Sequence, residues 1–161
     1  MTAAVGQYAL YVVAVAALIV WLTAIRREKI NLAIEAIFVM VLATVMIKVA
    51  GAAHSDPRPF VQNPALKPLF AHSADNGFPS DHTALAAAIA GLVTPYRRLI
   101  GYLLGLLTIA LGVSRVAANI HHLQDVAAGL IIGYLAAILG VVLWRQLVRP
   151  RLTGRLHDLT G

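Results

Sequence analysis

The segment Met1–Ile25, MTAAVGQYALYVVAVAALIVWLTAI, decides the fold because it carries no charged residue and ends at the charged cluster RREK of residues 26–29. An uncharged run of this length is enough to cross about 30 Å of hydrocarbon as a helix. A cleaved signal peptide would carry its basic residues before the apolar run, whereas here they follow it. The sequence therefore predicts a retained membrane helix over about residues 3–25.

The composition of the whole chain agrees with a membrane protein and excludes a soluble enzyme. Hydrophobic residues make up 60% of the 161 residues, charged residues only 12%, and the mean hydropathy is +0.79. Helices this apolar on every side cannot all face water. The net charge of +6 would suit nucleic acid, but the basic residues lie between apolar runs instead of along one face, so we expect no nucleic-acid partner. Without cysteine, the chain has no disulfide, thiolate metal site or cysteine nucleophile.

Four further apolar runs follow the first one. Together they predict five transmembrane helices, at about residues 3–25, 30–50, 80–96, 99–118 and 123–145. Proline, asparagine and glycine crowd the stretch between the second and third runs, which indicates one long loop over residues 51–79. No internal repeat or linker divides the sequence, so we expect a single all-α membrane helix bundle over residues 1–161. Within it, Glu35 and Lys48 would reach towards the lipid headgroups.

The basic residues also predict the orientation of the bundle. Five crossings place the two termini on opposite sides, and the positive-inside rule then compares the loops of each side. The first loop, the third loop and the C-terminal tail hold nine Lys or Arg residues, against four on the other side. The tail contributes Arg145, Arg149, Arg151 and Arg155. We therefore expect a multi-pass plasma-membrane protein with its C-terminus in the cytoplasm, and with its N-terminus, the 51–79 loop and the 114–124 connection outside.

Three polar clusters fall on the predicted outer side, at the ends of helices. They are Lys48 with Arg58-Pro59, the run Pro79-Ser80-Asp81-His82, and Ser114-Arg115 with His121 and Asp125. A phosphate ester requires charge neutralisation, a nucleophile and a proton donor, and fixed cations with two histidines and a serine supply these. Anchoring at the interface would explain one Lys or Arg, but not His, Ser and Asp at membrane depth, where polar groups are costly. The clusters therefore predict a catalytic phosphate site.

The same residues resemble the signature of the type 2 phosphatidic acid phosphatase (PAP2) family, K-x6-R-P, then P-S-G-H, then S-R-x5-H-x3-D. The third motif matches in full from Ser114 to Asp125, and the second differs only by Asp81 in place of glycine. In the first motif, Lys48 lies ten residues before Arg58 instead of seven. The resemblance covers about residues 48–125 and implies a PAP2/haloperoxidase-like core, although the family usually has six spans where this sequence predicts five.

The spacing of His121 and Asp125 indicates catalytic roles for both. Four residues apart, they share a helix face, so the carboxylate would hold one ring nitrogen and make the other a better nucleophile. The resemblance implies the same: His121 forms a phosphohistidine and His82 protonates the departing oxygen. The neighbouring His122 would be structural. The substrate phosphate would be bound by Lys48, Arg58, Ser80, Asp81 and Arg115.

Two residues of this set open the third predicted helix. Ser80 would cap it and leave backbone N–H groups available to phosphate oxygens. Asp81 would turn its charge away from the phosphate and favour the helix dipole. A metal site could also be imagined in the long loop, but the spacing of its His and Asp residues matches no ligand pattern, and a covalent histidine mechanism needs no cation, so we expect no metal and no cofactor. Those loop residues are His54, Asp56, His72 and Asp75.

The position of the site predicts the class of substrate. A site at headgroup depth suits a lipid-linked phosphate or diphosphate, with membrane lipids around it. The run HSADNGF at residues 72–78 resembles bacterial undecaprenyl-diphosphatases associated with bacitracin resistance, which implies conversion of undecaprenyl diphosphate to undecaprenyl phosphate on the outer face. A phosphatidylglycerophosphate or broad-specificity lipid phosphatase is the alternative, and a non-catalytic lipid or anion carrier is the second. The oligomeric state stays open, because Gly101-x-x-x-Gly105 and Gly129-x-x-x-Gly133 serve packing inside one bundle more often than dimerisation.

Overall fold

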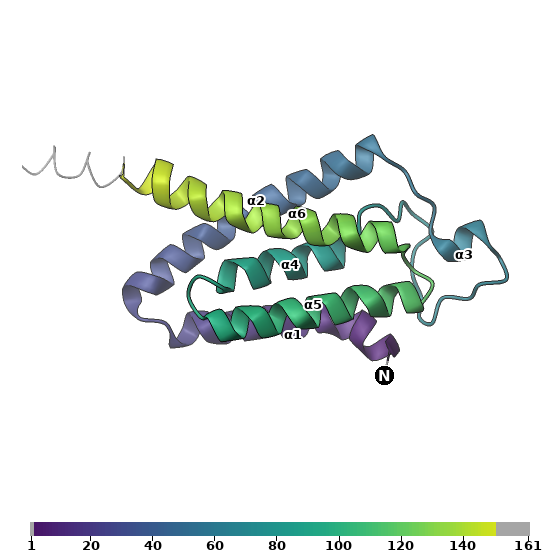
Figure 1. Ribbon diagram of the computed structural model, residues 1–161, viewed down its shortest axis with the longest axis horizontal. Coiled ribbons are helices and arrows are strands. Elements are labelled where there is room, and N and C mark those ends of the chain that lie inside the picture. Colours follow the sequence, from purple (N-terminus) through teal and green to yellow (C-terminus); the bar gives the residue numbers. More distant parts are fainter. Residues whose placement is uncertain (1, 151–161) are drawn as a thin grey trace, which may run out of the picture.

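The computed structural model describes residues 2–150, which form helices joined by loops (Figure 1). The prediction of an all-α membrane bundle is confirmed. Arg151 and Arg155, which entered the count of tail charges, lie outside the described residues. The elements are α1 (Thr2–Thr23), α2 (Arg26–Ala53), α3 (Pro59–Gln62), α4 (Asp81–Val93), α5 (Arg98–Ala117), α6 (Leu123–Val142) and the π-helix η1 (Leu143–Val148), which continues α6.

The predicted number of five spans needs correction. Four helices are long and apolar enough to cross a membrane: α1, α2, α5 and the continuous helix 123–148. The third predicted span is the 13-residue α4, which at 1.5 Å per residue measures only about 20 Å. It packs against α1, α2, α5 and α6, and most of its alanines are fully buried. Residues 80–96 were expected to span the membrane because alanine is apolar. In the structure the small size of alanine instead allows α4 to pack at the centre of the bundle.

Glycines bring the helices around α4 close to it. A Cβ at Gly129 of α6 would lie 2.7 Å from the Ser80 carbonyl oxygen, and one at Gly133 would meet the Ala84 carbonyl. A Cβ at Gly101 of α5 would collide with Thr94. Both small-residue pairs therefore pack inside this chain, as expected for a bundle in which contacts between backbones replace the hydrophobic effect.

The long connection between α2 and α4 is shorter than predicted, since α2 continues to Ala53. One side chain ties its two halves together. The Asn76 amide accepts hydrogen bonds from the backbone N–H groups of Asp56 and Phe78, and it donates to the carbonyls of Gly51 and His54, all at 2.9–3.1 Å. This places the segment before α4 directly against the end of α2.

The two ends of the bundle differ in chemistry. Figure 1 shows the N-terminal end of α1, the loop with α3 and the α5–α6 connection at one end, and the α1–α2 and α4–α5 connections at the other. At this second end Glu35 is fully buried, which corrects the expectation that it reaches the headgroups. Instead it accepts hydrogen bonds from Arg145 Nε at 2.6 Å and from the Tyr96 hydroxyl at 2.8 Å. A charge at this depth is tolerated because it is paired.

Candidate active site

The end of the bundle opposite Glu35 gathers most of the predicted site residues. Arg58 directly precedes α3, Ser80 occupies the N-cap position of α4 without the expected side-chain cap hydrogen bond, and Arg115 lies in the last turn of α5. His121 lies in the α5–α6 connection, and Asp125 in the first turn of α6. Residues far apart in the sequence thus meet because three helix ends and one loop share the same end of the bundle.

His121 has one ring nitrogen held and the other directed at a cation. Its Nδ1 lies 2.9 Å from the Gly77 carbonyl oxygen and 3.4 Å from Asp125 Oδ2, and its Nε2 lies 3.2 Å from Arg58 Nη1. Because a carbonyl only accepts, Nδ1 carries the ring proton, and Nε2 keeps a lone pair. Burial lowers the pKa of His121, with the charges of Arg115 and Arg58 adding to this and Asp125 opposing it. The ring is therefore neutral, and its Nε2 lone pair accepts a hydrogen bond from Arg58, which a substrate phosphate would replace before Nε2 attacks.

Asp125 is fully buried and makes hydrogen bonds with several partners. Its Oδ2 accepts the backbone N–H of His122 at 2.8 Å, and its own carbonyl accepts the backbone N–H of Ser80 at 3.0 Å. The sequence predicts Asp125 as the acceptor for the ring proton of His121. The nearer acceptor is the Gly77 carbonyl, which no side-chain motif indicates. A Cβ at Gly77 would lie 3.0 Å from the Asp56 carbonyl and 3.3 Å from Asp125 Oδ2, so the close approach requires glycine.

The two arginines are both buried and both already hydrogen-bonded. Arg58 donates from Nε to Asp75 Oδ1 at 2.9 Å, with Nη2 at 2.8 Å from the same oxygen, and from Nη1 to the Ile120 carbonyl at 3.1 Å. Arg115 donates from Nη1 to the Gly6 carbonyl at 2.8 Å and from Nη2 to His72 Nε2 at 2.9 Å. Only 1% of Arg115 is exposed. The loop residues His72 and Asp75 therefore belong to this site, although the sequence analysis placed neither of them there.

The residues that open α4 lie beside the arginines. Ser80 is fully buried, and its hydroxyl lies 3.0 Å from that of Thr83. His82 makes no hydrogen bond within residues 2–150, and the positive charge of Arg115 acts on it. Asp81 is exposed in the first turn of α4, where a carboxylate is favourable to the helix dipole.

Lys48 is the predicted residue that the structure does not bring to the others. It is exposed on α2, and among the described residues it makes no hydrogen bond or ion pair. The stretch between it and Arg58, three residues longer than the family spacing, covers the end of α2 and the loop that follows. Its contact with a phosphate therefore stays a prediction.

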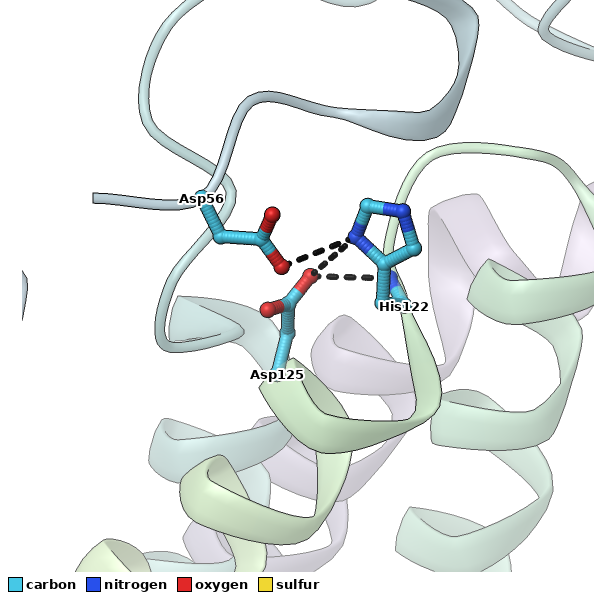
Figure 2. A group of neighbouring side chains, drawn as sticks. All are labelled: Asp56, His122 and Asp125. Carbon is cyan, nitrogen blue, oxygen red and sulfur yellow. Dashed lines mark hydrogen bonds and ion pairs between the residues drawn. The ribbon is translucent and has the colours of Figure 1, made fainter. Parts of the chain in front are cut away.

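A second polar group shares Asp125 with this site (Figure 2). Asp56, His122 and Asp125 offer ligand atoms that all lie within 4.8 Å of one another, which is close enough to hold a metal ion. Figure 2 shows the ring of His122 facing both carboxylates, with its Nδ1 2.9 Å from Asp56 Oδ2 and 3.8 Å from Asp125 Oδ2.

Within this group Asp56 is hydrogen-bonded by Gln62 at 3.0 Å and by Gln124 at 2.6 Å, whereas His122 Nδ1 and Asp125 Oδ1 have no hydrogen-bond partner within residues 2–150. Burial would raise the pKa of Asp56, but the 2.6 Å hydrogen bond from Gln124 and the charge of His122 lower it. Asp56 therefore stays ionised as the partner of His122. The four loop residues considered for a metal do not gather, because His72 and Asp75 turn to the arginines and His54 packs edge-on against Phe78.

Comparison with known proteins assigns the family. The model of the PAP2 superfamily matches residues 32–149. The bacitracin transport permease protein BcrC of Bacillus licheniformis is 35% identical over 133 residues, which are 83% of this chain and 65% of that protein. The undecaprenyl-diphosphatase BcrC of Bacillus subtilis is 32% identical over 151 residues, 91% of this chain and 74% of that protein. The crystal structure of Aquifex aeolicus LpxE superimposes with a TM-score of 0.69 and 26% identity, covering 84% of this chain and 82% of LpxE. The chain is thus a multi-pass membrane protein that belongs to the PAP2 superfamily.

Proposed function

We propose that this protein is a metal-independent lipid phosphatase that removes the terminal phosphate of undecaprenyl diphosphate through a phosphohistidine at His121. The observation that carries the proposal is the state of His121. Its Nδ1 is held by Gly77 and Asp125, while its Nε2 lone pair lies 3.2 Å from an arginine that would bind the phosphate. A nucleophile, its orienting groups and a charge-neutralising cation are thus in contact before any substrate arrives.

The reaction follows from these contacts. Nε2 of His121 attacks the terminal phosphorus, the bond to the bridging oxygen breaks, and the electron pair leaves with that oxygen. Arg58 and Arg115 neutralise the charge that develops on the phosphoryl oxygens. The imidazolium that forms is stabilised by Asp125, and His82 supplies the proton to the leaving oxygen. Water activated by His82 then attacks the phosphohistidine, which releases inorganic phosphate and restores neutral His121.

A lipid substrate on the outer face is supported by the position of the site and by the relatives. The site lies at one end of a bundle whose four long helices are apolar enough to cross a membrane, so a phosphate on a hydrophobic tail would reach it from the bilayer. One relative bears the name undecaprenyl-diphosphatase. The orientation with this end outside rests on the nine-to-four charge count of the sequence.

Other functions remain candidates beside this one. A phosphatidylglycerophosphate or broad-specificity lipid phosphatase would use the same residues on a different tail. The name transport permease, which another relative carries, favours a lipid or anion carrier as the second alternative. A carrier needs the cations of the site but not the oriented His121.

A substrate panel separates these functions. The purified full chain in detergent is given undecaprenyl diphosphate, phosphatidylglycerophosphate and phosphatidate at equal mole fractions, and release of inorganic phosphate is measured, with His121→Ala as the control for contaminating phosphatases. We expect the highest kcat/KM on the prenyl diphosphate. Preference for a glycerolipid would replace the substrate assignment. If no phosphate is released from any lipid, the phosphatase proposal fails and the carrier function is favoured.

A further inference from the structure

One short segment of the outer loop occupies both arginines of the site. Asp75 lies 2.8–2.9 Å from two nitrogens of Arg58, and His72 accepts a hydrogen bond from Arg115 at 2.9 Å. No more than 5% of Arg58, Arg115 or His121 is exposed. A phosphate can therefore reach them only when His72 and Asp75 release the arginines or bind them together with the phosphate. The behaviour of His72 and Asp75 on binding is therefore part of substrate recognition.

The hydrogen bonds of His72 fix its protonation state in the empty site. Arg115 only donates, so His72 Nε2 accepts and carries no proton. Its Nδ1 lies 3.4 Å from the Ser73 carbonyl, which only accepts, so this nitrogen holds the ring proton. The charged and titratable groups that face the ring are Arg58, Arg115, His121 and, from α4, His82. Burial, assisted by the charge of Arg58, lowers the pKa of His72, in agreement with a neutral ring.

The contacts of Arg115 place His72 beside a phosphate that binds its Nη2. Its Nη1 donates to the Gly6 carbonyl on the side of α1, and its Nε is buried without a partner within residues 2–150. Nη2, the nitrogen that contacts His72, carries a second N–H that an anion from the loop side can accept. The phosphate oxygen then lies beside His72 Nε2, and two acceptors would repel each other unless one of them gains a proton.

We infer that His72 is a substrate-binding residue: when phosphate binds Arg115, the ring takes up one proton from solvent at Nε2 and donates it in a hydrogen bond to a phosphate oxygen. This inference rests on the proposed function and adds a third cationic ligand to its site. Asp75 behaves in the opposite way, because a carboxylate ionised beside Arg58 can only compete with phosphate. Two residues of one loop segment thus have effects of opposite sign.

Binding of inorganic phosphate to the purified full chain, measured by titration calorimetry, tests the inference. A charge-assisted hydrogen bond lost in His72→Ala should weaken phosphate binding by about tenfold or more. Asp75→Asn should tighten it, and His54→Ala, an exposed histidine of the same loop whose ring makes no polar contact within residues 2–150, should leave it unchanged. Tighter or unchanged binding in His72→Ala would show that His72 only fills the empty site.

A second measurement covers the case in which His72→Ala does not fold. His72→Gln keeps the size and the hydrogen bond but cannot be protonated. Titrations in two buffers of different ionisation enthalpy give the number of protons taken up with phosphate, and this number should be about one lower in His72→Gln than in the wild type. Equal proton uptake would overturn the inference. These measurements use phosphate alone, so a lipid panel without turnover would remove the proposed function and leave this result standing.

Discussion

Replacing Asp125 with asparagine distinguishes the contribution of the Asp125 carboxylate from that of the Gly77 carbonyl, the two groups that contact His121 Nδ1. The oxygen of the new amide would still accept the His122 N–H, and the NH₂ of the amide would take the place of Asp125 Oδ1, which has no hydrogen-bond partner within residues 2–150. The Gly77 carbonyl, 2.9 Å from Nδ1, would keep the proton there. The tautomer therefore survives, and only the carboxylate charge is lost.

The size of the loss follows from the distance between the two side chains. Opposite unit charges 3.4 Å apart attract by about 5 kcal/mol at an effective dielectric constant of about 20. If about half of the imidazolium charge has developed in the transition state, about 2.5 kcal/mol is lost, which is about 10²-fold in kcat. KM should change little, because Asp125 does not contact the phosphate.

The assay is phosphate release under saturating lipid, with kcat and KM determined separately for the wild type and Asp125→Asn. A control variant, Glu28→Gln, removes a carboxylate that pairs with Arg97 at the other end of the bundle and should lower kcat far less. A loss of about 10⁴ or more in Asp125→Asn would equal the cost of a wrong tautomer. That result would refute the role given to the Gly77 carbonyl.

Four further predictions address the nucleophile, its titration, the orientation and the metal. His121→Ala should abolish turnover but leave binding of the lipid substrate in detergent, measured by calorimetry, nearly intact; turnover at the wild-type level would contradict the assignment. Because burial lowers the pKa of His121, and the ring must be neutral to attack, kcat/KM should hold as the pH falls to about 6.5 and decline only below it; a decline centred above that pH would disprove this. A cysteine at Lys67 should react with a membrane-impermeant reagent on intact cells, and labelling only after lysis would reverse the orientation. Dialysis against a chelator should leave activity unchanged. If activity is instead lost and Zn²⁺ or Mg²⁺ restores it in the wild type but not in His122→Ala, a metal is bound at Asp56 and His122.

The sequence predicts the membrane helices well because a long uncharged run has few alternatives. The first, second, fourth and fifth predicted spans coincide with described helices to within a few residues. The third fails as a span because hydropathy does not distinguish alanines that face lipid from alanines that pack against other helices. Glu35 was misplaced for a related reason: its partners Arg145 and Tyr96 lie far along the chain, and pairing across the bundle has no local signal.

The candidate site was predictable where the spacing of side chains carries the information. His121 and Asp125 stand four residues apart, and the motif around Arg115 is complete, so their association could be predicted. The carbonyl of Gly77 was not predictable, because a backbone acceptor has no residue type that marks it. His72 and Asp75 looked like ordinary loop residues, and only the fold of the connection before α4 shows which cations they meet.

The length of α4 sets how deep a substrate must reach. A rod of about 20 Å inside neighbours that each cover about 30 Å cannot touch both surfaces of the bilayer. Its first turn meets the first turn of α6, where the Ser80 N–H donates to the Asp125 carbonyl, so the proposed phosphate site stands at this end of the bundle. A substrate would therefore bring only its phosphate to the start of α4, while its hydrophobic tail stays beside the longer helices.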